Sequence, residues 1–138
     1  MAVIGPNADE VKELICRYGP TNPPIITPLE GLRRRLPNAV IRYAKGCEIV
    51  DPHYPQSEIL EFPLSADEQQ MIDEAVQIAE QSEVAILVLG GSERTVRESR
   101  SRTDLRLPGH QERLLKAELE GYTDYCSRVK WRILPLIW

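Results

Sequence analysis

A single glutamate, Glu98, lies in a segment that is otherwise rich in cations. The segment reads TVRESRSRTDLRLPGHQ, and the arginines around the glutamate are Arg94, Arg97, Arg100 and Arg102. A carboxyl group on a loop can donate a proton to a leaving group and later take one from water, which is general acid–base catalysis. One interpretation is therefore a catalytic acid in a site that another part of the protein completes. The simpler interpretation is a solvated loop whose charges pair with one another.

Other residues that could do chemistry are isolated. The cysteines Cys16, Cys47 and Cys126 are far apart and form no C-x-x-C pair, so we expect reduced structural thiols. His53 and His110 also lack neighbouring ligands, and we expect neither a metal site nor a cofactor.

The stretch GGSERT, residues 90–95, could form a glycine-rich turn that cradles an anion. Neither G-x-G-x-x-G nor G-x-x-x-x-G-K-[ST] is present, so nucleotide binding is a weak interpretation.

The composition is that of one ordinary globular domain. The chain has 138 residues, a net charge of −4, 42% apolar residues and 28% charged residues. The negative charge gives no footprint for nucleic acid, and the tract Arg33-Arg34-Arg35 is interpreted as the solvated end of a helix. No apolar run approaches the roughly 20 residues that span a membrane. The N-terminus lacks a signal-peptide pattern and enters an apolar stretch at once, as if cut from a longer chain.

Strand and helix patterns alternate along the chain. Short apolar runs predict strands over Ala2–Ile4, Ala39–Tyr43 and Val84–Gly91. Four helix starts are predicted, at Asn7, Thr27-Pro28, Ser65 and Pro108-Gly109. The first precedes the apolar stripe Val11, Leu14, Ile15 and Tyr18, and the last precedes Leu114, Leu115 and Leu119.

Two of these helices carry a predicted capping box. Thr27 with Glu30 is expected to cap the first, and Ser65 with Glu68 the second. The apolar faces expected to turn inward are Leu29, Leu32 and Leu36 in the first helix, and Met71, Ala75, Ile78 and Ala79 in the second.

This order predicts an α/β fold: a small three-layer sandwich around a mainly parallel sheet of about three strands. The continuous apolar character of Val84–Gly91 predicts a strand covered on both faces. Loops at the carboxyl ends of parallel strands share one rim, which would hold Gly5–Asn7, Gly46–Glu48 and the long loop over residues 90–107. Glu98 is thereby placed on the functional rim, on an exposed loop.

The residues carry a family resemblance. AVIGPNADE, TPLEGLRRRLPNAVIRYAKGCEIVD and DEAVQIAEQSEVAILVLGGSERTVRESRSRTDLRLPGHQERLLKA resemble the C-terminal α/β sandwich domain of glycoside hydrolase family 3, from Ala2 to about Ala117. The most specific part is the ordered pattern VLGG followed by E-S-x-S-R-T-D-L-x-L-P-G-x-Q.

The resemblance implies a role for several residues. The family contains β-glucosidases, β-xylosidases and related exo-acting enzymes, in which a preceding (β/α)₈ barrel binds the sugar and supplies an aspartate nucleophile. Glu98 matches the general acid/base, while Arg97, Arg102 and Asp104 are expected to support its loop. Nothing here matches the barrel, so the nucleophile is expected to be absent from this chain. Members are often secreted or periplasmic, but the sequence assigns no compartment.

The sequence departs from the family pattern after Ala117. The codons for Thr123 through Trp131, read one base later, can encode Pro-Ile-Ile-Val-Val-Val-Leu-Asn-Gly, which is the strand and turn expected next. We therefore interpret residues 1–117 as a partial family domain and residues 118–138 as a frameshifted tail. The tail run VKWRILPLIW is rich in β-formers, and Pro135 confines it to a sheet edge. We expect it, or the exposed sheet edge, to mediate a homo-oligomer.

Two functions stay open at this stage. The chain is either the acid/base half of a retaining β-glycosidase, acting on terminal β-glucosides, β-xylosides or short oligosaccharides and weakly active at best alone, or a noncatalytic sugar-binding or inert fragment. A second carboxylate from this chain could complete the site only if Asp9, Glu48, Asp51, Glu93 or Asp104 reached Glu98, which we regard as the weaker interpretation.

Overall fold

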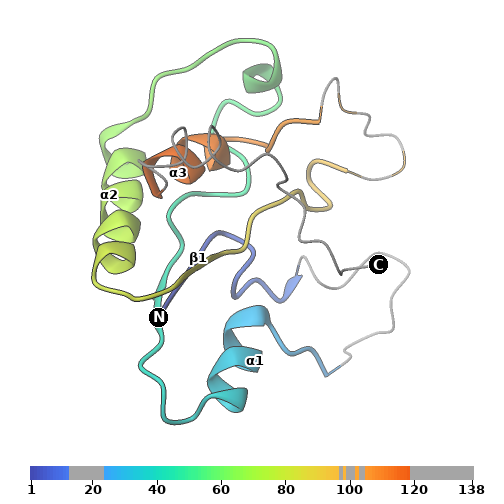
Figure 1. Cartoon of the computed structure of the whole chain (residues 1–138). Coiled ribbons are helices and arrows are strands. Elements are labelled where there is room, and N and C mark those ends of the chain that lie inside the picture. Colours follow the sequence, from blue (N-terminus) through green and yellow to red (C-terminus); the bar gives the residue numbers. More distant parts are fainter. Residues whose placement is uncertain (13–23, 97, 99–101, 103–104, 119–138) are drawn as a thin grey trace, which may run out of the picture.

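The structure is a computed structural model that describes residues 1–12, 24–96, 98, 102 and 105–118 (Figure 1). Its elements are β1 (Ala2–Ile4), α1 (Pro28–Arg35), β2 (Arg42–Ala44), the 3₁₀ turn η2 (Gln56–Glu58), α2 (Ala66–Glu80), β3 (Ala85–Leu87) and α3 (Gln111–Glu118). The α/β class is confirmed. Most of the helix predicted after Asn7, together with the tail and its proposed edge strand, lies outside the described residues.

The sheet is parallel and has β1 at its centre. The strand order is β2-β1-β3, and Val3 lies opposite Tyr43 on one side and Ile86 on the other. All three residues of β1 are fully buried, as a short apolar strand between two neighbours should be.

Alternate residues of β1 enter two separate cores, because side chains of a strand point to opposite faces. Ala2 and Ile4 pack with Ile72, Ala75 and Leu114 in a cluster on the side of α2 and α3. Val3 packs on the other side in a second cluster, with Ala8 and Leu29 of α1. Figure 1 shows α1 below the strands and α2 and α3 above and beside them, so the predicted three layers are present.

The second predicted capping box is confirmed. The Ser65 hydroxyl accepts a hydrogen bond from the Glu68 backbone N–H, and the Glu68 carboxylate accepts one from the Ser65 backbone N–H. Ile72, which was not in the predicted apolar face, is the most buried residue of that face after Ala75.

Among the described residues, no helix is both long and apolar enough to cross a bilayer.

Three details of the prediction are wrong. Glu30 does not close a capping box, since its carboxylate instead pairs with Arg34 one turn later. Leu36 is 38% exposed because it is the C-cap of α1 and has left the helical stripe. The run predicted to be covered on both faces is partly exposed: Val84, just before β3, is 50% exposed, and β3 lies at an edge of the described sheet rather than at its centre.

A close approach of two chain segments fixes the end of β1. Gly5 has φ +131°, and a Cβ placed there would lie 2.2 Å from the carbonyl oxygen of Val88. Both the backbone conformation and the space therefore require glycine.

We predict that Gly5→Ala lowers the free energy of unfolding by about 3 kcal/mol, because it adds backbone strain to a backbone clash. Gly31→Ala is the matched control. It lies inside α1, where the new Cβ would meet only the Ile26 side chain at 3.5 Å, and it should be neutral or stabilising by about 0.5–1 kcal/mol. Urea unfolding followed by circular dichroism measures both; equal effects would contradict the described contact.

The junction of α2 and α3 contains a buried carboxyl group. Burial raises the pKa of Glu118 from 4.5 to about 7, and the Glu80 carboxylate adds to the rise. Both carboxyl oxygens of Glu118 are buried and have no hydrogen-bond partner in the described part of the chain. The neutral form is therefore favoured in the folded state.

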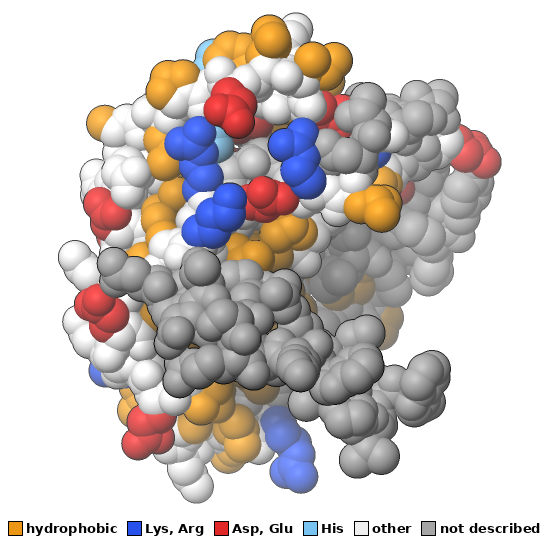
Figure 2. Space-filling model, turned by 45° about the horizontal axis from the view of Figure 1, so that its top comes forward, with side chains coloured by type: hydrophobic (Ala, Val, Ile, Leu, Met, Phe, Trp, Pro, Cys, Tyr) orange, Lys and Arg blue, Asp and Glu red, His pale blue; other side chains and the backbone are white. Residues whose placement is uncertain are grey.

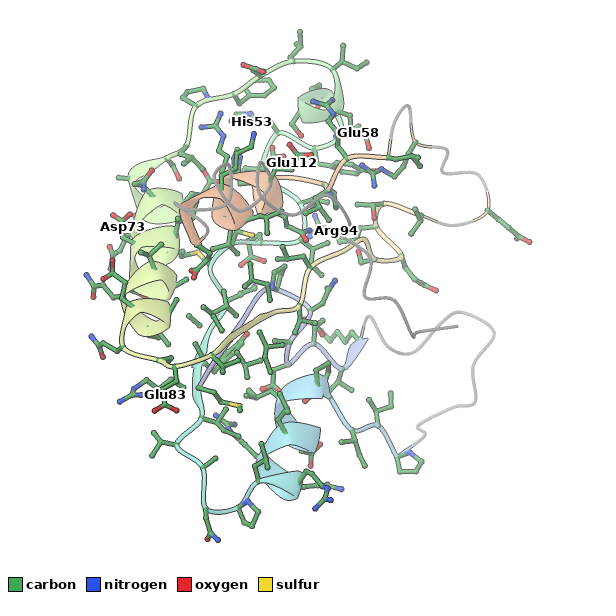
Figure 3. All side chains as sticks on the ribbon, in the orientation of Figure 1. His53, Glu58, Asp73, Glu83, Arg94 and Glu112 are labelled. Atoms are coloured by element: carbon green, nitrogen blue, oxygen red, sulfur yellow. The ribbon has the colours of Figure 1, made fainter. Side chains whose placement is uncertain are left out.

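A raised carboxyl pKa stabilises the fold at low pH. The contribution of Glu118 is fully present below about 4.5 and is lost as pH rises through about 7. We expect Glu118→Gln to reduce the fall in melting temperature between pH 5 and pH 8. Asp73→Asn, on the outer side of α2, should leave that fall unchanged (Figure 3). A wild-type pH profile in Glu118→Gln would contradict the assignment.

Candidate functional site

The loops at the carboxyl ends of the three strands meet at one rim, as predicted. The Gly5 N–H donates to the carbonyl oxygen of Ala44 at the end of β2, at 3.1 Å. The side-chain amide of Asn7 donates to the carbonyl oxygen of Gly91, past the end of β3, at 3.5 Å. Residues far apart in the sequence thus define one edge of the sheet, from which the Glu98 loop departs.

Gln111 holds the start of that loop. Its side chain is fully buried, and its oxygen accepts from the Gly90 N–H at 2.7 Å while its nitrogen donates to the Gly90 carbonyl at 2.9 Å. The same nitrogen donates to the carbonyl oxygen of Ile49 at 3.1 Å. One side-chain amide therefore pairs with both backbone groups of Gly90 and connects the exits of β2 and β3 to the first turn of α3.

A compact turn follows Gly91. The Ser92 N–H donates to the hydroxyl of Thr95 at 2.9 Å, and the Arg94 N–H donates to the hydroxyl of Ser92 at 3.0 Å. The Thr95 N–H donates to the Ser92 carbonyl, and the Thr95 side chain is fully buried. These backbone donors are used within the turn, which argues further against an anion cradle at GGSERT.

The predicted site residues fall in different places. Glu98 lies in a turn with an exposed side chain, as expected for the loop. Arg102 is partly buried, and one of its guanidinium nitrogens donates to the carbonyl oxygen of Arg106. Arg97 and Asp104 lie outside the described residues, so their supporting roles stay predictions.

Three of the five acids considered as a second carboxylate have local partners, and Asp104 lies outside the described residues. Asp9 accepts a hydrogen bond from the Thr27 hydroxyl at 2.7 Å, and Glu48 pairs with Lys45 at 2.5 Å. Asp51 is 4% exposed and accepts from the His53 N–H at 2.8 Å. Each has a local structural role that sequence alone did not assign.

A polar hollow of about 280 Å³ lies beside the rim, between α3 and the segment 51–62. Sequence reasoning missed it, because its walls come from segments without a recognisable motif. Figure 2 shows Lys and Arg side chains interleaved with Asp and Glu on this face. The charged lining residues are Arg102, Arg106, Arg113, Lys116, Asp51, Glu58, Glu61 and Glu112. Glu58 and Glu112 lie near one another there, whereas Glu83 lies at the opposite end of the sheet (Figure 3).

His110 and Glu68 form a buried pair at the back of this hollow. The Nε2 atom of His110 is 3.3 Å from Oε1 of Glu68, and both side chains are mostly buried. Burial raises the pKa of Glu68, but hydrogen bonds from Ser65 and the nearby His110 lower it by more than burial raises it. The net pKa is therefore below its usual value. Glu68 is therefore a stable anion that caps α2 and faces the start of α3.

Cys47 is a structural thiol, as predicted. It is 2% exposed in the core, and burial raises its pKa to about 12, so it does not form a nucleophilic thiolate near neutral pH. Cys16 and Cys126 lie outside the described residues. Within the described ranges, no three His, Cys, Asp or Glu side chains gather as metal ligands; His53 instead stacks on Phe62, with ring centroids 4.0 Å apart.

Comparison with known proteins places this rim and loop in a family. The sequence profile described as "Glycosyl hydrolase family 3 C-terminal domain" matches residues 1–123. The chain therefore belongs to the family of glycosyl hydrolase family 3 C-terminal domains.

Relatives with assigned names are glycosidases. A probable β-D-xylosidase 7 of Arabidopsis thaliana is 36% identical over 115 residues, which are 83% of this chain and 13% of the relative. A β-xylosidase of Formosa agariphila is 35% identical (85% of this chain, 15% of the relative), and a periplasmic β-glucosidase of Salmonella typhimurium is 33% identical (85% and 16%). The chain thus spans only about a sixth or less of the length of these relatives.

Solved structures agree. A β-glucosidase from Erythrobacter marinus matches with a TM-score of 0.68 at 31% identity, over 86% of this chain and 18% of its own. A family 3 exo-β-xylosidase, solved with a xylobiose aziridine probe, matches with a TM-score of 0.66 at 28% identity, over 86% and 13%.

We predict that Gln111→Ala lowers the free energy of unfolding by about 3 kcal/mol, because it removes the partner of the buried Ile49 carbonyl and of both partly buried backbone groups of Gly90. Gln77→Ala, at an exposed position of α2, is the matched control and should change it by no more than about 0.5 kcal/mol. Urea unfolding compares the two.

Gln111→Glu tests the direction of the hydrogen bonds. A carboxylate can still accept from Gly90 but cannot donate to the two carbonyl groups, so this variant should be less stable at pH 8 than at pH 5, relative to wild type. A variant as stable as wild type at both values would show that the junction does not depend on the amide nitrogen.

Proposed function

We propose that this chain supplies the general acid/base of a retaining β-glycosidase of the β-glucosidase or β-xylosidase type, and that Glu98 is that residue. The observation that carries the proposal is the position of Glu98: an exposed side chain on the loop that leaves the carboxyl end of β3. Family membership and the names of the relatives support the substrate class of terminal β-linked sugars.

The chemistry requires a partner. Retaining hydrolysis uses two carboxyl groups about 5–5.5 Å apart, one as nucleophile and the other as acid and then base. An exposed glutamate on a loop anchored at both ends can reach a sugar held by a neighbouring domain, and donate its proton to the departing oxygen. The nucleophile would come from that neighbour, so the isolated chain is expected to be weakly active at best.

A chimera tests the role of Glu98. This chain replaces the matching residues of the Salmonella periplasmic β-glucosidase, and β-glucosides with good and poor leaving groups are compared. Glu98→Gln should lower kcat/KM for poor leaving groups by about 10²–10⁴-fold, the usual contribution of general acid–base catalysis, and much less for nitrophenyl glycosides. Azide should restore turnover of the activated substrate, because it needs no base to attack the glycosyl-enzyme.

Glu93→Gln is the matched control, since Glu93 lies in the same loop region close to the compact turn at Ser92. It should keep most of the chimera's activity. Equal losses in both variants, or a Glu98→Gln variant with full activity on poor leaving groups, would reject Glu98 as the acid/base. Calorimetry of the chain alone with glucose, xylose and cellobiose tests the alternative of a noncatalytic sugar-binding module.

A further inference from the structure

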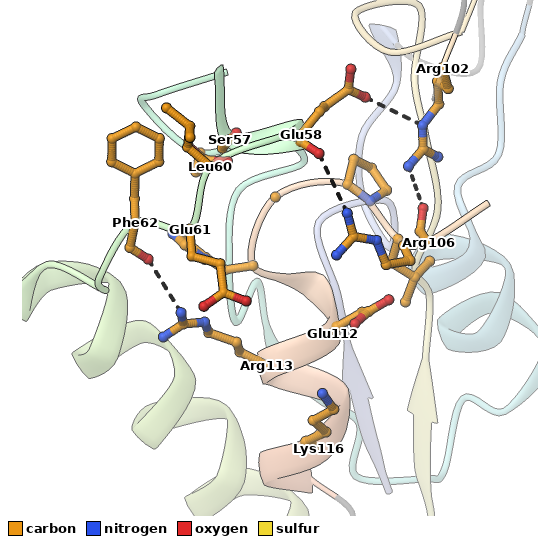
Figure 4. A pocket seen from close by; sticks show the side chains of 15 residues that line it. Ser57, Glu58, Leu60, Glu61, Phe62, Arg102, Arg106, Glu112, Arg113 and Lys116 are labelled. Atoms are coloured by element: carbon orange, nitrogen blue, oxygen red, sulfur yellow. Dashed lines mark hydrogen bonds and ion pairs between the residues drawn. The ribbon is translucent and has the colours of Figure 1, made fainter. Parts of the chain in front are cut away.

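Glu58 reaches the loop that carries Glu98 from a distant part of the sequence. It is the last residue of η2, in the connection between β2 and α2. Oε1 of Glu58 lies 3.5 Å from Nε of Arg102, and a guanidinium nitrogen of Arg106 donates to the Glu58 backbone carbonyl at 3.4 Å. Figure 4 shows both arginines directed toward Glu58 along the upper side of the hollow.

The two arginines are also connected to each other, because Nη2 of Arg102 donates to the carbonyl oxygen of Arg106. Glu58, Arg102 and Arg106 are therefore connected to one another by three contacts, and we call this group the Glu58 clamp. The Glu58 carboxylate pairs with the side chain of Arg102, and the Glu58 backbone carbonyl accepts a hydrogen bond from the side chain of Arg106.

The Glu58 clamp is shielded from water. The side chains of Arg102 and Glu58 are 17% and 18% exposed, against 60% and 40% for the Arg34–Glu30 pair on α1. Solvent screens a buried ion pair less than an exposed one, and removing one partner leaves an uncompensated charge. The clamp is thus a more effective restraint than a surface pair.

The position of the clamp along the loop gives it a role. On the N-terminal side of Glu98, Gln111 fixes Gly90 and the turn at Ser92 follows. On the C-terminal side, Arg102 and Arg106 tie the loop to η2. Glu98 lies between the two anchors along the chain.

We propose that Glu58 is a positioning residue for Glu98: by holding Arg102 and Arg106 it sets where the loop presents the acid/base to the sugar. This inference rests on the proposed function of Glu98. It gives the cations of the loop a purpose apart from pairing with Glu98, and it assigns a catalytic consequence to a segment that carries no catalytic motif.

Tryptic cleavage of the whole chain tests the clamp without any activity assay. Trypsin must take the arginine side chain into its own specificity pocket, so cleavage after Arg102 and Arg106 is hindered while Glu58 holds them. Glu58→Ala should speed cleavage after Arg102 severalfold, relative to cleavage after Arg94 in the same digest, with sites assigned by mass spectrometry. Cleavage after Arg106 should change less, because alanine keeps the backbone carbonyl that Arg106 binds. Glu58→Gln should have a smaller effect, since it loses the ion pair with Arg102 but keeps an amide oxygen that can accept a hydrogen bond from the guanidinium.

Glu61→Ala is the matched control. Glu61 lines the same hollow, and its side chain makes no hydrogen bond or ion pair with the described residues. It should leave the cleavage ratio at the wild-type value. Unchanged cleavage in Glu58→Ala, or an equal change in Glu61→Ala, would overturn the clamp whatever the function of Glu98.

The effect of Glu58 on catalysis is measured in the chimera. Misplacing a reacting group by about 1 Å can cost up to 10²-fold in rate, so we expect Glu58→Ala to lower kcat by about tenfold or more with little change in KM, and Glu58→Gln to recover part of it. The loss of kcat/KM, which reports the step that needs the acid, should be greater for poor leaving groups than for nitrophenyl glycosides, as for Glu98→Gln. A uniform loss over both substrates would mark a merely structural role and overturn the positioning inference.

The cleavage experiment and the chimera experiment together distinguish failure of the proposed function from failure of the positioning role. If Glu98→Gln has no effect on poor leaving groups, the proposed function fails, while the cleavage ratio still decides whether the clamp exists. If Glu98→Gln behaves as an acid/base variant and Glu58→Ala keeps full kcat, Glu98 is catalytic and the positioning role is rejected.

Discussion

The arrangement of the rim depends on one side-chain amide. Gln111 pairs with the N–H and the carbonyl of Gly90 as a neighbouring strand would, and it also binds the carbonyl of Ile49. Buried backbone groups must find partners, and at this point β2 and β3 have already ended. A glutamine at the start of α3 meets that need for both exits at once, so hydrogen bonds connect the two strand exits to the start of the helix.

The rest of the scaffold follows from burying a very short central strand. β1 has three residues and enters two cores, so each face of the sheet needs its own cover: α1 on one side, α2 and α3 on the other. Close packing at the carboxyl end leaves no room for a side chain at Gly5. Tight packing there brings the three exit loops together at one rim, and the long loop after Gly90 departs from it.

The cations around Glu98 also have a structural explanation. Arg102 and Arg106 bind Glu58 in a separate segment, so the cationic loop is held by an acid outside it. The simple interpretation expected these charges to pair within a solvated loop, whereas Arg102 pairs with the Glu58 carboxylate outside the loop and Arg106 binds the Glu58 backbone carbonyl. A catalytic carboxylate and a charge-paired loop are compatible, because the pairing can hold the loop while Glu98 stays exposed.

The sequence by itself determined the α/β class, the approximate position of each strand, the Ser65 capping box and the place of Glu98 beyond β3. These follow from local signals: apolar runs, caps, and a motif with fixed spacing. The sequence wrongly predicted that Glu30 closes a capping box and that Leu36 is buried. Glu30 pairs instead with Arg34 one turn away, and Leu36 lies at the C-cap, where the helix ends. Only the tertiary structure decided the contacts of Gln111 with Gly90 and Ile49, and the contacts of Glu58 with Arg102 and Arg106. These contacts join segments that are far apart in the sequence and that only the fold brings together. No local sequence pattern predicts which partner such a distant carboxylate or amide will meet.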